Sequence, residues 1–239
     1  INRATDRLNY YVSGGFYDQD VPISLDLEAM KCKEPDAETL AKYPYAFTLR
    51  IGYKLNGNKI QVMWEVCNDD DKTMYFQIGA HPAFYYPDFN PDTEERGAFR
   101  LYKRGENGEM KPLESLKYLL ISEKGCADTE HVHELQTPDG RLPLKTTTFD
   151  RDAFIVDNQQ VSKVVLESCE GEPFVSLEFD TPALGLWSPA GLNAPFVCIE
   201  PWYGRCDRAG FTGEFSEKDL VNAVEPGQSF RASYTIEVF

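Results

Sequence analysis

The chain has 239 residues, with 39 acidic and 24 basic side chains and a formal net charge of −15 at pH 7. Nucleic acid and anionic membrane surfaces would repel so acidic a protein, which argues against both as partners. No apolar run is long enough to cross a membrane, and no signal-peptide pattern opens the chain. Because the first residue is Ile1 rather than methionine, we expect the full protein to have residues before it. The length predicts one domain, residues 1–239, with a sizeable core.

The first predicted element is a short helix over residues 36–42, with Asp36 as its N-cap and Pro44 beyond its end. Residues 47–55 then alternate apolar and polar side chains, which is typical of a half-buried strand. The Asn-Gly-Asn turn at residues 56–58 is a strong hairpin signal, and alternation resumes over residues 60–66. This segment therefore predicts two antiparallel strands.

The rest of the chain continues in the same manner, with short apolar runs separated by turn residues. Residues 113–121 give a second, weaker helix prediction, and no other helical periodicity is present, which disfavours alternating strand–helix folds. An all-β fold follows, either a large antiparallel β-sandwich or an open barrel. Further strands are predicted at residues 74–78, 163–168, 174–179, 185–188, 196–200 and 230–238.

Glu200 lies at the end of the apolar run that starts at Phe196, and Pro201 and Trp202 follow it. Proline has no N–H for a sheet ladder, so we expect regular pairing to stop at Pro201 and Glu200 to face a cleft at a strand end. A carboxylate beside an exposed aromatic ring suits the binding and deprotonation of a sugar. Equally, Glu200 could pair with an arginine and Trp202 could fill the core.

His81 follows the predicted strand at residues 74–78 and precedes Pro82, so it too is expected at a strand end. Its pKa near neutrality suits a proton donor, although a lone histidine is more often satisfied by backbone groups in a turn. His131 and His133 lie in a polar stretch that we interpret as a solvated loop. In residues 149–155, Asp150 and Asp152 could accept hydrogen bonds from sugar hydroxyls or simply cap a turn.

The cysteines are scattered, with no CxxC pair, which indicates reduced thiols and a cytoplasmic protein. Cys198 and Cys206 are isolated from the three histidines along the sequence, so no zinc site is predicted. The six positions are Cys32, Cys67, Cys126, Cys169, Cys198 and Cys206.

Several motifs in succession resemble the galactose mutarotase-like family (aldose 1-epimerases), particularly its LacX-like branch. Together the motifs span nearly the whole chain from Glu38 onward, in the family's order. This succession is far more specific evidence for the family than any single motif. The motifs are Glu38-Thr39-Leu40 with Tyr43-Pro44, residues 49–53, Gly79-Ala80-His81-Pro82-Ala83-Phe84, residues 149–153, residues 184–188, residues 198–204 and Glu225-Pro226-Gly227.

The resemblance implies a supersandwich of antiparallel strands and interconversion of the α and β anomers of a free aldose. In that family a glutamate at the position of Glu200 acts as base on the anomeric hydroxyl, and a histidine at the position of His81 protonates the ring oxygen. No metal, nucleotide or covalent intermediate is implied, and Glu200 must be ionised to act as base. The predicted sugar-binding residues are Asp152, Asp150, Trp202, Trp187 and Phe84.

The chain departs from the family's pattern near its start. Relatives carry a His-Gly-Phe-Ala-Arg-like motif there, and the nearest match, Gly14-Gly15-Phe16-Tyr17-Asp18, supplies neither the histidine nor the arginine. Three alternatives stay open: a non-catalytic sugar-binding sandwich, a glycoside hydrolase using Glu200 with Asp152, and a hexose-6-phosphate mutarotase using Arg205 and Arg208. The sequence is compatible with a monomer or a homodimer.

Overall fold

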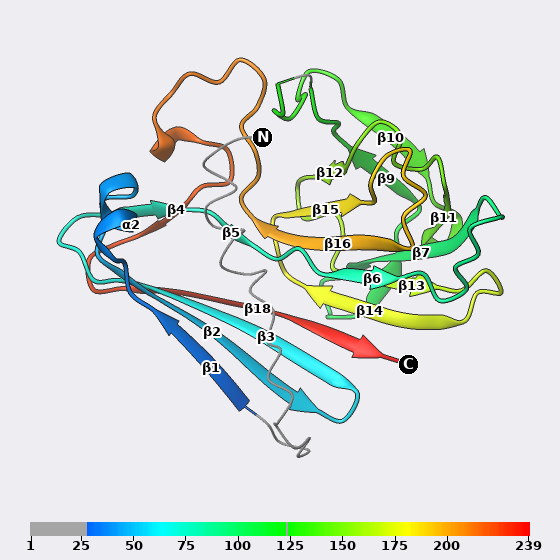
Figure 1. The fold of residues 1–239 in the computed structure, drawn as a ribbon, viewed down its shortest axis with the longest axis horizontal. Helices are drawn as coiled ribbons and strands as arrows, with labels where there is room; N and C mark the ends of the chain where they lie inside the picture. Colours follow the sequence, from blue (N-terminus) through cyan, green and yellow to red (C-terminus); the bar gives the residue numbers. More distant parts are fainter. Residues whose placement is uncertain (1–27, 123) are drawn as a thin grey trace.

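The computed structural model describes residues 28–122 and 124–239, with the side chains of residues 28–32 excepted. Within this part of the chain, nearly all regular structure is antiparallel β, which confirms the predicted all-β sandwich. A large sheet forms one layer (Figure 1). Its strands, in spatial order, are β1 (Glu28–Lys33), β2 (Phe47–Asn56), β3 (Lys59–Asn68), β18 (Ser229–Val238), β14 (Pro173–Phe179), β13 (Lys163–Glu167), β7 (Glu95–Arg104) and β11 (Arg141–Lys145), and β8 (Met110–Pro112) pairs with β7.

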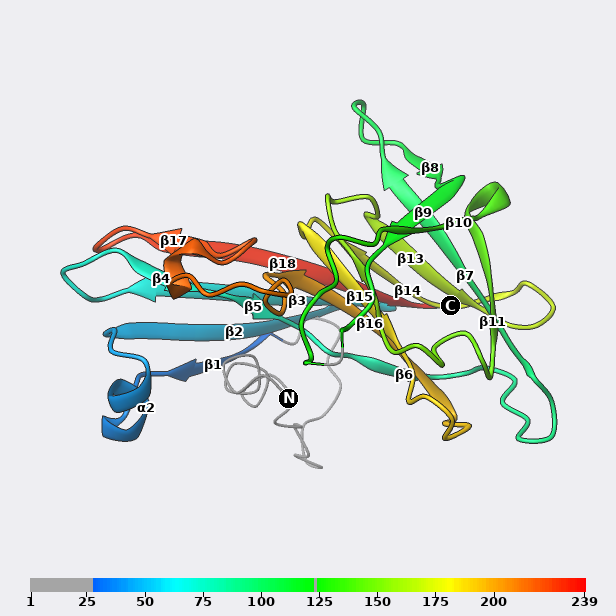
Figure 2. The same cartoon turned by 90° about the horizontal axis from the view of Figure 1, so that it is seen from above.

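A smaller sheet packs on part of this layer. Its central strand, β16 (Phe196–Tyr203), has β15 (Ala183–Trp187) on one side, followed by β12 (Phe154–Val156). On its other side β16 pairs with two short strands of one segment, β5 (Ile78–Gly79) and β6 (Ala83–Tyr85). Figure 2 shows how strongly the large sheet twists, with β1, β2, β3 and β18 extending away from the smaller sheet.

The remaining elements are short. The helix α2 (Ala37–Lys42) has the predicted cap, because the Asp36 carboxylate accepts a hydrogen bond from the Thr39 amide at 2.8 Å. Two separate two-stranded antiparallel sheets are formed by β9 (Ser115–Tyr118) with β10 (His133–Gln136), and by β17 (Asn222–Val224) with β4 (Met74–Phe76). The described residues also include two 3₁₀ turns, η1 (Pro138–Gly140) and η2 (Phe215–Glu217).

The helix predicted over residues 113–121 is wrong, because β9 occupies the middle of this segment. Leu116 is fully buried while Lys117 beside it is exposed, so the side chains alternate with the period of a strand. The strand predicted over residues 74–78 is divided between β4 and β5, which pair with different partners. The other predicted strands correspond to strands of the two sheets, and the 56–58 turn joins β2 to β3 as predicted, with Gly57 at a φ of +59°.

The main core lies between the two sheets. Strand β16 contributes Val197 and Ile199, and β15 contributes Leu184 and Leu186; all four are at most 2% exposed. On β18, Phe230, Ala232, Tyr234 and Ile236 face this core, while Val238 at the strand end is 46% exposed. Because side chains alternate along a strand, the intervening residues of β15 and β16 lie on the outer face of the smaller sheet.

No helix in the described residues is long and apolar enough to span a membrane. The cysteines whose side chains are described, Cys67, Cys126, Cys169, Cys198 and Cys206, are free thiols. The side chain of Cys32 and the segment Gly14–Asp18, which is the departure from the family's pattern, lie outside the described residues.

Candidate functional site

The site is built on the outer face of β16. Phe196, Cys198, Glu200 and Trp202 alternate with the core residues of this strand and therefore share that face. Glu200 is nearly buried there, with only 6% of its side chain exposed. Burial of an ionised carboxylate costs free energy unless a nearby group pairs with it by charge or hydrogen bonding.

The prediction that pairing stops at Pro201 is wrong. Strand β16 continues to Tyr203, and Pro201 keeps its place in the ladder opposite Leu184 of β15. The Pro201 carbonyl accepts a hydrogen bond from the Ala80 amide at 3.1 Å, so the side of Pro201 that lacks an N–H faces the segment joining β5 to β6. Pairing is interrupted in that segment, which is why the proline is tolerated in the middle of a sheet.

His81 lies in that interruption, directly opposite Glu200. The pairs Trp202–Gly79 and Cys198–Ala83 flank the break in one continuous register, so the position between them brings His81 against Glu200. Figure 1 shows β5 and β6 along the same edge of β16. The two functional groups meet, with His81 Nε2 3.4 Å from Glu200 Oε1.

Burial shifts the proton affinities of both groups. Burial in the sheet surface raises the pKa of Glu200 to about 8, with Asp152 adding to the rise and a hydrogen bond from Trp202 opposing it. Burial also lowers the pKa of His81, against a backbone hydrogen bond that favours its charged form. Near neutral pH the resting pair therefore holds one proton, on the carboxyl group, whereas the family resemblance implies an ionised glutamate.

Trp202 lies flat across the sheet toward Glu200, and two glycines make room for it. A Cβ at Gly185 would lie 2.3 Å from Trp202 Cζ2, and one at Gly79 would lie 2.6 Å from Trp202 Cδ1. Gly185 is the register partner of Glu200, so the indole reaches over β15 to donate its hydrogen bond to the carboxylate. Sequence reasoning did not predict that either glycine makes room for Trp202, although an isolated glycine in a strand signals such a close approach.

Other aromatic side chains line the same face. The Trp187 ring meets the His81 ring edge to face, with centroids 5.7 Å apart and an interplanar angle of 87°. Phe196 lies next along, 6.4 Å from Trp187 between centroids, and its register partner Tyr85 is 70% exposed. This row offers apolar ring faces and edges beside the acid–base pair, as sugar-binding sites commonly do.

A small second core bounds the face on the side of Trp202. It consists of Leu119, Ala127 and Ile155, with Trp202 and Cys206 packed against it. Leu119 and Ile155 exchange backbone hydrogen bonds of 2.8 and 3.0 Å, so the chain around residue 119 is fixed to the edge strand β12. The wall beside Trp202 is thereby held in place by backbone pairing.

The remaining predicted site residues differ in whether they lie near His81 and Glu200. Asp152 is exposed in the left-handed region, at a φ of 77°, and lies close enough to Glu200 to raise its pKa. Asp150 is exposed on the preceding turn, where its amide bonds to the Thr147 carbonyl at 3.2 Å. Phe84 pairs with Val197 and packs against the main core, on the opposite face from His81 and Glu200. The structure therefore does not bring Phe84 into the site.

The other two histidines lie elsewhere. His131 is exposed and pairs with Asp128 at 2.9 Å, in the solvated loop that the sequence predicts. The same prediction is wrong for His133, which begins β10 and lies with its ring centroid 5.4 Å from that of Tyr118.

Arg205 and Arg208 are both engaged by carboxylates. Arg205 is buried and contacts Asp157 at 2.9 Å and Asp219 at 2.8 Å. Arg208 contacts the other oxygen of Asp219 at 2.5 Å. Neither arginine is therefore positioned as a free anion-binding group, and the phosphate-binding alternative loses its supporting observation.

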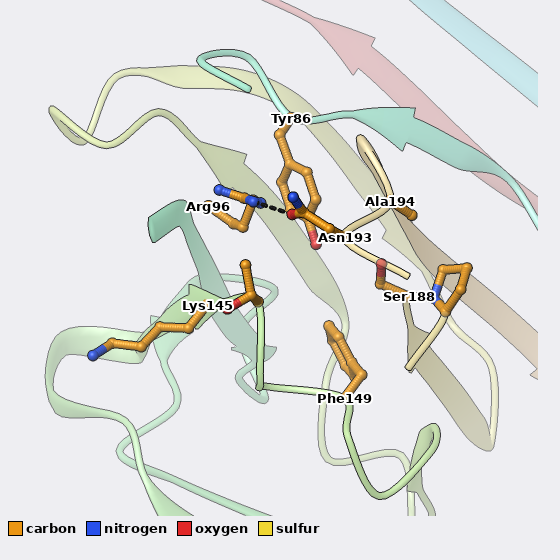
Figure 3. A pocket seen from close by; sticks show the side chains of 9 residues that line it. Tyr86, Arg96, Lys145, Phe149, Ser188, Asn193 and Ala194 are labelled. Atoms are coloured by element: carbon orange, nitrogen blue, oxygen red, sulfur yellow. Dashed lines mark hydrogen bonds between the residues drawn. The ribbon is translucent and has the colours of Figure 1, made fainter. Parts of the chain in front are cut away.

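Figure 3 shows a separate pocket, which Ser188 helps to line. It has room for about one water molecule. The buried Arg96 within it donates hydrogen bonds to the carbonyls of Asn90, Thr93 and Glu95 and to the Asn193 side chain, so its guanidinium serves the local backbone. The lining residues are Tyr86, Arg96, Lys145, Thr146, Phe149, Ser188, Pro189, Asn193 and Ala194.

Comparisons with known proteins bear on the family and the fold of the chain. The family model described as Aldose 1-epimerase matches residues 26–221. The chain is 30% identical over 208 residues to Protein LacX (chromosomal) of Lactococcus lactis subsp. lactis, covering 86% of this chain and 66% of that protein. The chain thus spans just under two thirds of the length of this relative, and the plasmid-encoded LacX matches to the same extent.

Two solved structures share the fold closely. A galactose mutarotase-like protein from Lactobacillus casei superposes with a TM-score of 0.78 at 28% identity, over 92% of this chain and 72% of the other. A galactose mutarotase related enzyme from Lactobacillus acidophilus gives a TM-score of 0.77 at 26% identity, over 91% of this chain and 69% of the other. The family-model match over residues 26–221 includes both His81 and Glu200.

Proposed function

The chain belongs to the aldose 1-epimerase family, and we propose that it interconverts the α and β anomers of a free aldose, with Glu200 as base and His81 as acid. The observation that carries the proposal is the 3.4 Å approach of His81 Nε2 to Glu200 Oε1 beside an aromatic surface. The names of the two similar structures point to galactose as the first sugar to test.

The close approach suits this reaction specifically. The anomeric hydroxyl and the ring oxygen are bonded to the same carbon, so an acid and a base acting on them must lie close together. The 3.4 Å spacing of His81 Nε2 and Glu200 Oε1 therefore suits opening of a hemiacetal.

The proton count of the pair supports the same conclusion. Transfer of the shared proton from Glu200 to His81 generates a carboxylate and an imidazolium without exchange with solvent, and the sugar hydroxyls stabilise both charges. The carboxylate then takes the proton of the anomeric hydroxyl while the imidazolium protonates the ring oxygen. The C1–O5 bond breaks, the C1 hydroxyl becomes an aldehyde, and closure after rotation about C1–C2 reverses both transfers. Each group contributes roughly 10²–10⁴-fold to the rate.

Trp202, Trp187 and Asp152 orient the sugar in this proposal. Trp202 also keeps the carboxylate available, because its hydrogen bond favours the ionised form of Glu200. Asp150 lies on the exposed turn two residues before Asp152 and is kept as a more remote hydroxyl contact.

The test is anomer exchange of galactose and glucose, followed by NMR or polarimetry. We expect Glu200→Gln and His81→Gln each to slow exchange by about 10²–10⁴-fold. His131→Gln, in the exposed pair with Asp128, is the matched control and should retain the wild-type rate. Exchange that is equally fast in wild type and Glu200→Gln would refute the mechanism. Saturable sugar binding without any exchange would support a non-catalytic sugar-binding protein instead.

A further inference from the structure

A third side chain with a metal-binding atom lies beside the acid–base pair. Cys198 Sγ, His81 Nε2 or Nδ1 and a carboxylate oxygen of Glu200 all lie within 4.8 Å of one another. Cys198 and Glu200 are two residues apart on β16 and face the same side, and His81 approaches from the facing segment. The three donors therefore converge on one point between β16 and the break in its neighbour.

The spacing is close to that of a metal site. Zinc bonds of about 2.0–2.3 Å at tetrahedral angles place neighbouring ligand atoms roughly 3.3–3.7 Å apart. The pair formed by His81 and Glu200 already meets this spacing at 3.4 Å, and the thiol needs to move by on the order of 1 Å. Rotation about the Cα–Cβ bond of a cysteine moves its sulfur by distances of this order while the backbone stays in place.

The donor set selects the class of cation. A thiolate, an imidazole and one carboxylate suit the borderline-soft ions Zn²⁺, Co²⁺ and Cd²⁺, whereas Mg²⁺ and Ca²⁺ require mostly oxygen ligands. His81 is 45% exposed in its side chain, so an ion reaches the site from that side and keeps its fourth position open to solvent.

The surroundings already orient the ligands. Trp202 donates a hydrogen bond to the Glu200 carboxylate, and the Trp187 ring contacts the His81 imidazole edge to face. Such contacts behind the ligands typically change metal affinity by about 10–100-fold when they are lost.

We propose that His81, Cys198 and Glu200 bind a borderline-soft divalent cation such as Zn²⁺, and that the bound ion blocks anomer exchange. Binding displaces the thiol proton and the carboxyl proton, which pass to the solvent. The carboxylate then has its electron pair on the ion and cannot accept the proton of the sugar hydroxyl, and the imidazole nitrogen cannot be protonated. The inhibitory part of this inference rests on the proposed function; the binding part does not.

The binding test is titration of the protein with CdCl₂ and CoCl₂ while the thiolate-to-metal charge-transfer absorption is followed. Wild type should develop this band with one ion per chain, and Cys198→Ser should lose it. Cys169→Ser is the matched control, because Cys169 is an exposed free thiol outside the site, and it should keep the band. His81→Gln and Glu200→Gln should each weaken binding at least about 10-fold. A band that persists in Cys198→Ser, or no band in wild type, would overturn the proposal.

The inhibition test is galactose anomer exchange with increasing ZnCl₂. We expect ZnCl₂ to inhibit wild type and Cys169→Ser. In Cys198→Ser, the concentration of ZnCl₂ that gives half-inhibition should be at least about 10-fold higher. Each variant is compared with its own metal-free rate. If metal-free wild type shows no exchange, the proposed function fails while the charge-transfer titration still decides the metal site. Undiminished exchange by a fully metal-loaded protein would show that Glu200 is not a ligand.

Discussion

The burial of Glu200 should make the protein less stable at alkaline pH, and Glu200→Gln should remove this loss. The pKa of Glu200 is raised from 4.5 to about 8, so the folded protein binds this proton more tightly than the unfolded chain does. The free energy of unfolding therefore falls as the pH rises from the unfolded pKa to the folded one, and no penalty is present below both values.

The magnitude follows from the size of the shift. At 1.36 kcal/mol per pKa unit, a rise from 4.5 to about 8 corresponds to about 5 kcal/mol in full, of which about 4 kcal/mol is lost between about pH 5 and about pH 9. Glutamine has nearly the same shape and does not titrate, so the variant lacks this term. We expect Glu200→Gln to gain about 4 kcal/mol relative to wild type over this pH interval.

The assay is urea unfolding of both proteins across this pH interval, followed by tryptophan fluorescence. Glu167→Gln is a matched control, because Glu167 is equally buried but is paired with Arg100 at 2.5 Å. That variant leaves a guanidinium unpaired and should be destabilised. If the stability difference between Glu200→Gln and wild type does not change with pH, the carboxyl group is not held in its protonated form by burial, and the shared-proton account of the site is wrong.

Two further predictions concern the supports of the site. Gly185→Ala places a methyl group 2.3 Å from Trp202 Cζ2, so the indole should be displaced. The variant should therefore show slower anomer exchange and a shifted tryptophan emission. Emission and exchange that both match wild type would contradict this packing. Arg205→Leu leaves the carboxylates of Asp157 and Asp219 without this buried partner. Urea unfolding should show that the free energy of unfolding is lower by about 3–5 kcal/mol. An unchanged midpoint of unfolding would mean that these ion pairs do not stabilise the protein.

Local patterns in the sequence were sufficient to predict the fold class. The alternation over residues 47–55 and 60–66 and the Asn-Gly turn between them determine the β2–β3 hairpin, because side-chain period and turn geometry are short-range properties. The cap at Asp36 is equally local. The motif order from Glu38 onward also placed the chain in its family, which the comparisons confirm.

The mistaken predictions share a physical origin. The segment 113–121 has no helix because Leu116 is buried by tertiary packing and β9 pairs with a strand from residues 133–136, a partner that local propensity does not register. Pro201 remains inside β16 because its nitrogen, which carries no hydrogen, faces the segment between β5 and β6, where strand pairing is interrupted. Neither outcome can be read from the segment alone.

The sequence by itself determined which residues could do chemistry: one histidine between a strand and a proline, and one glutamate beside a tryptophan. Only the tertiary structure decided that they meet, since the register that flanks the break beside β16 sets His81 opposite Glu200. The same register brings His81 to Cys198, two residues that the sequence separates widely enough to argue against a metal site. It also decided the protonation of Glu200, because a pKa depends on how much water the folded chain removes from the group. Distances across a sheet and the exclusion of solvent are properties of strands packed together, and no single strand contains them.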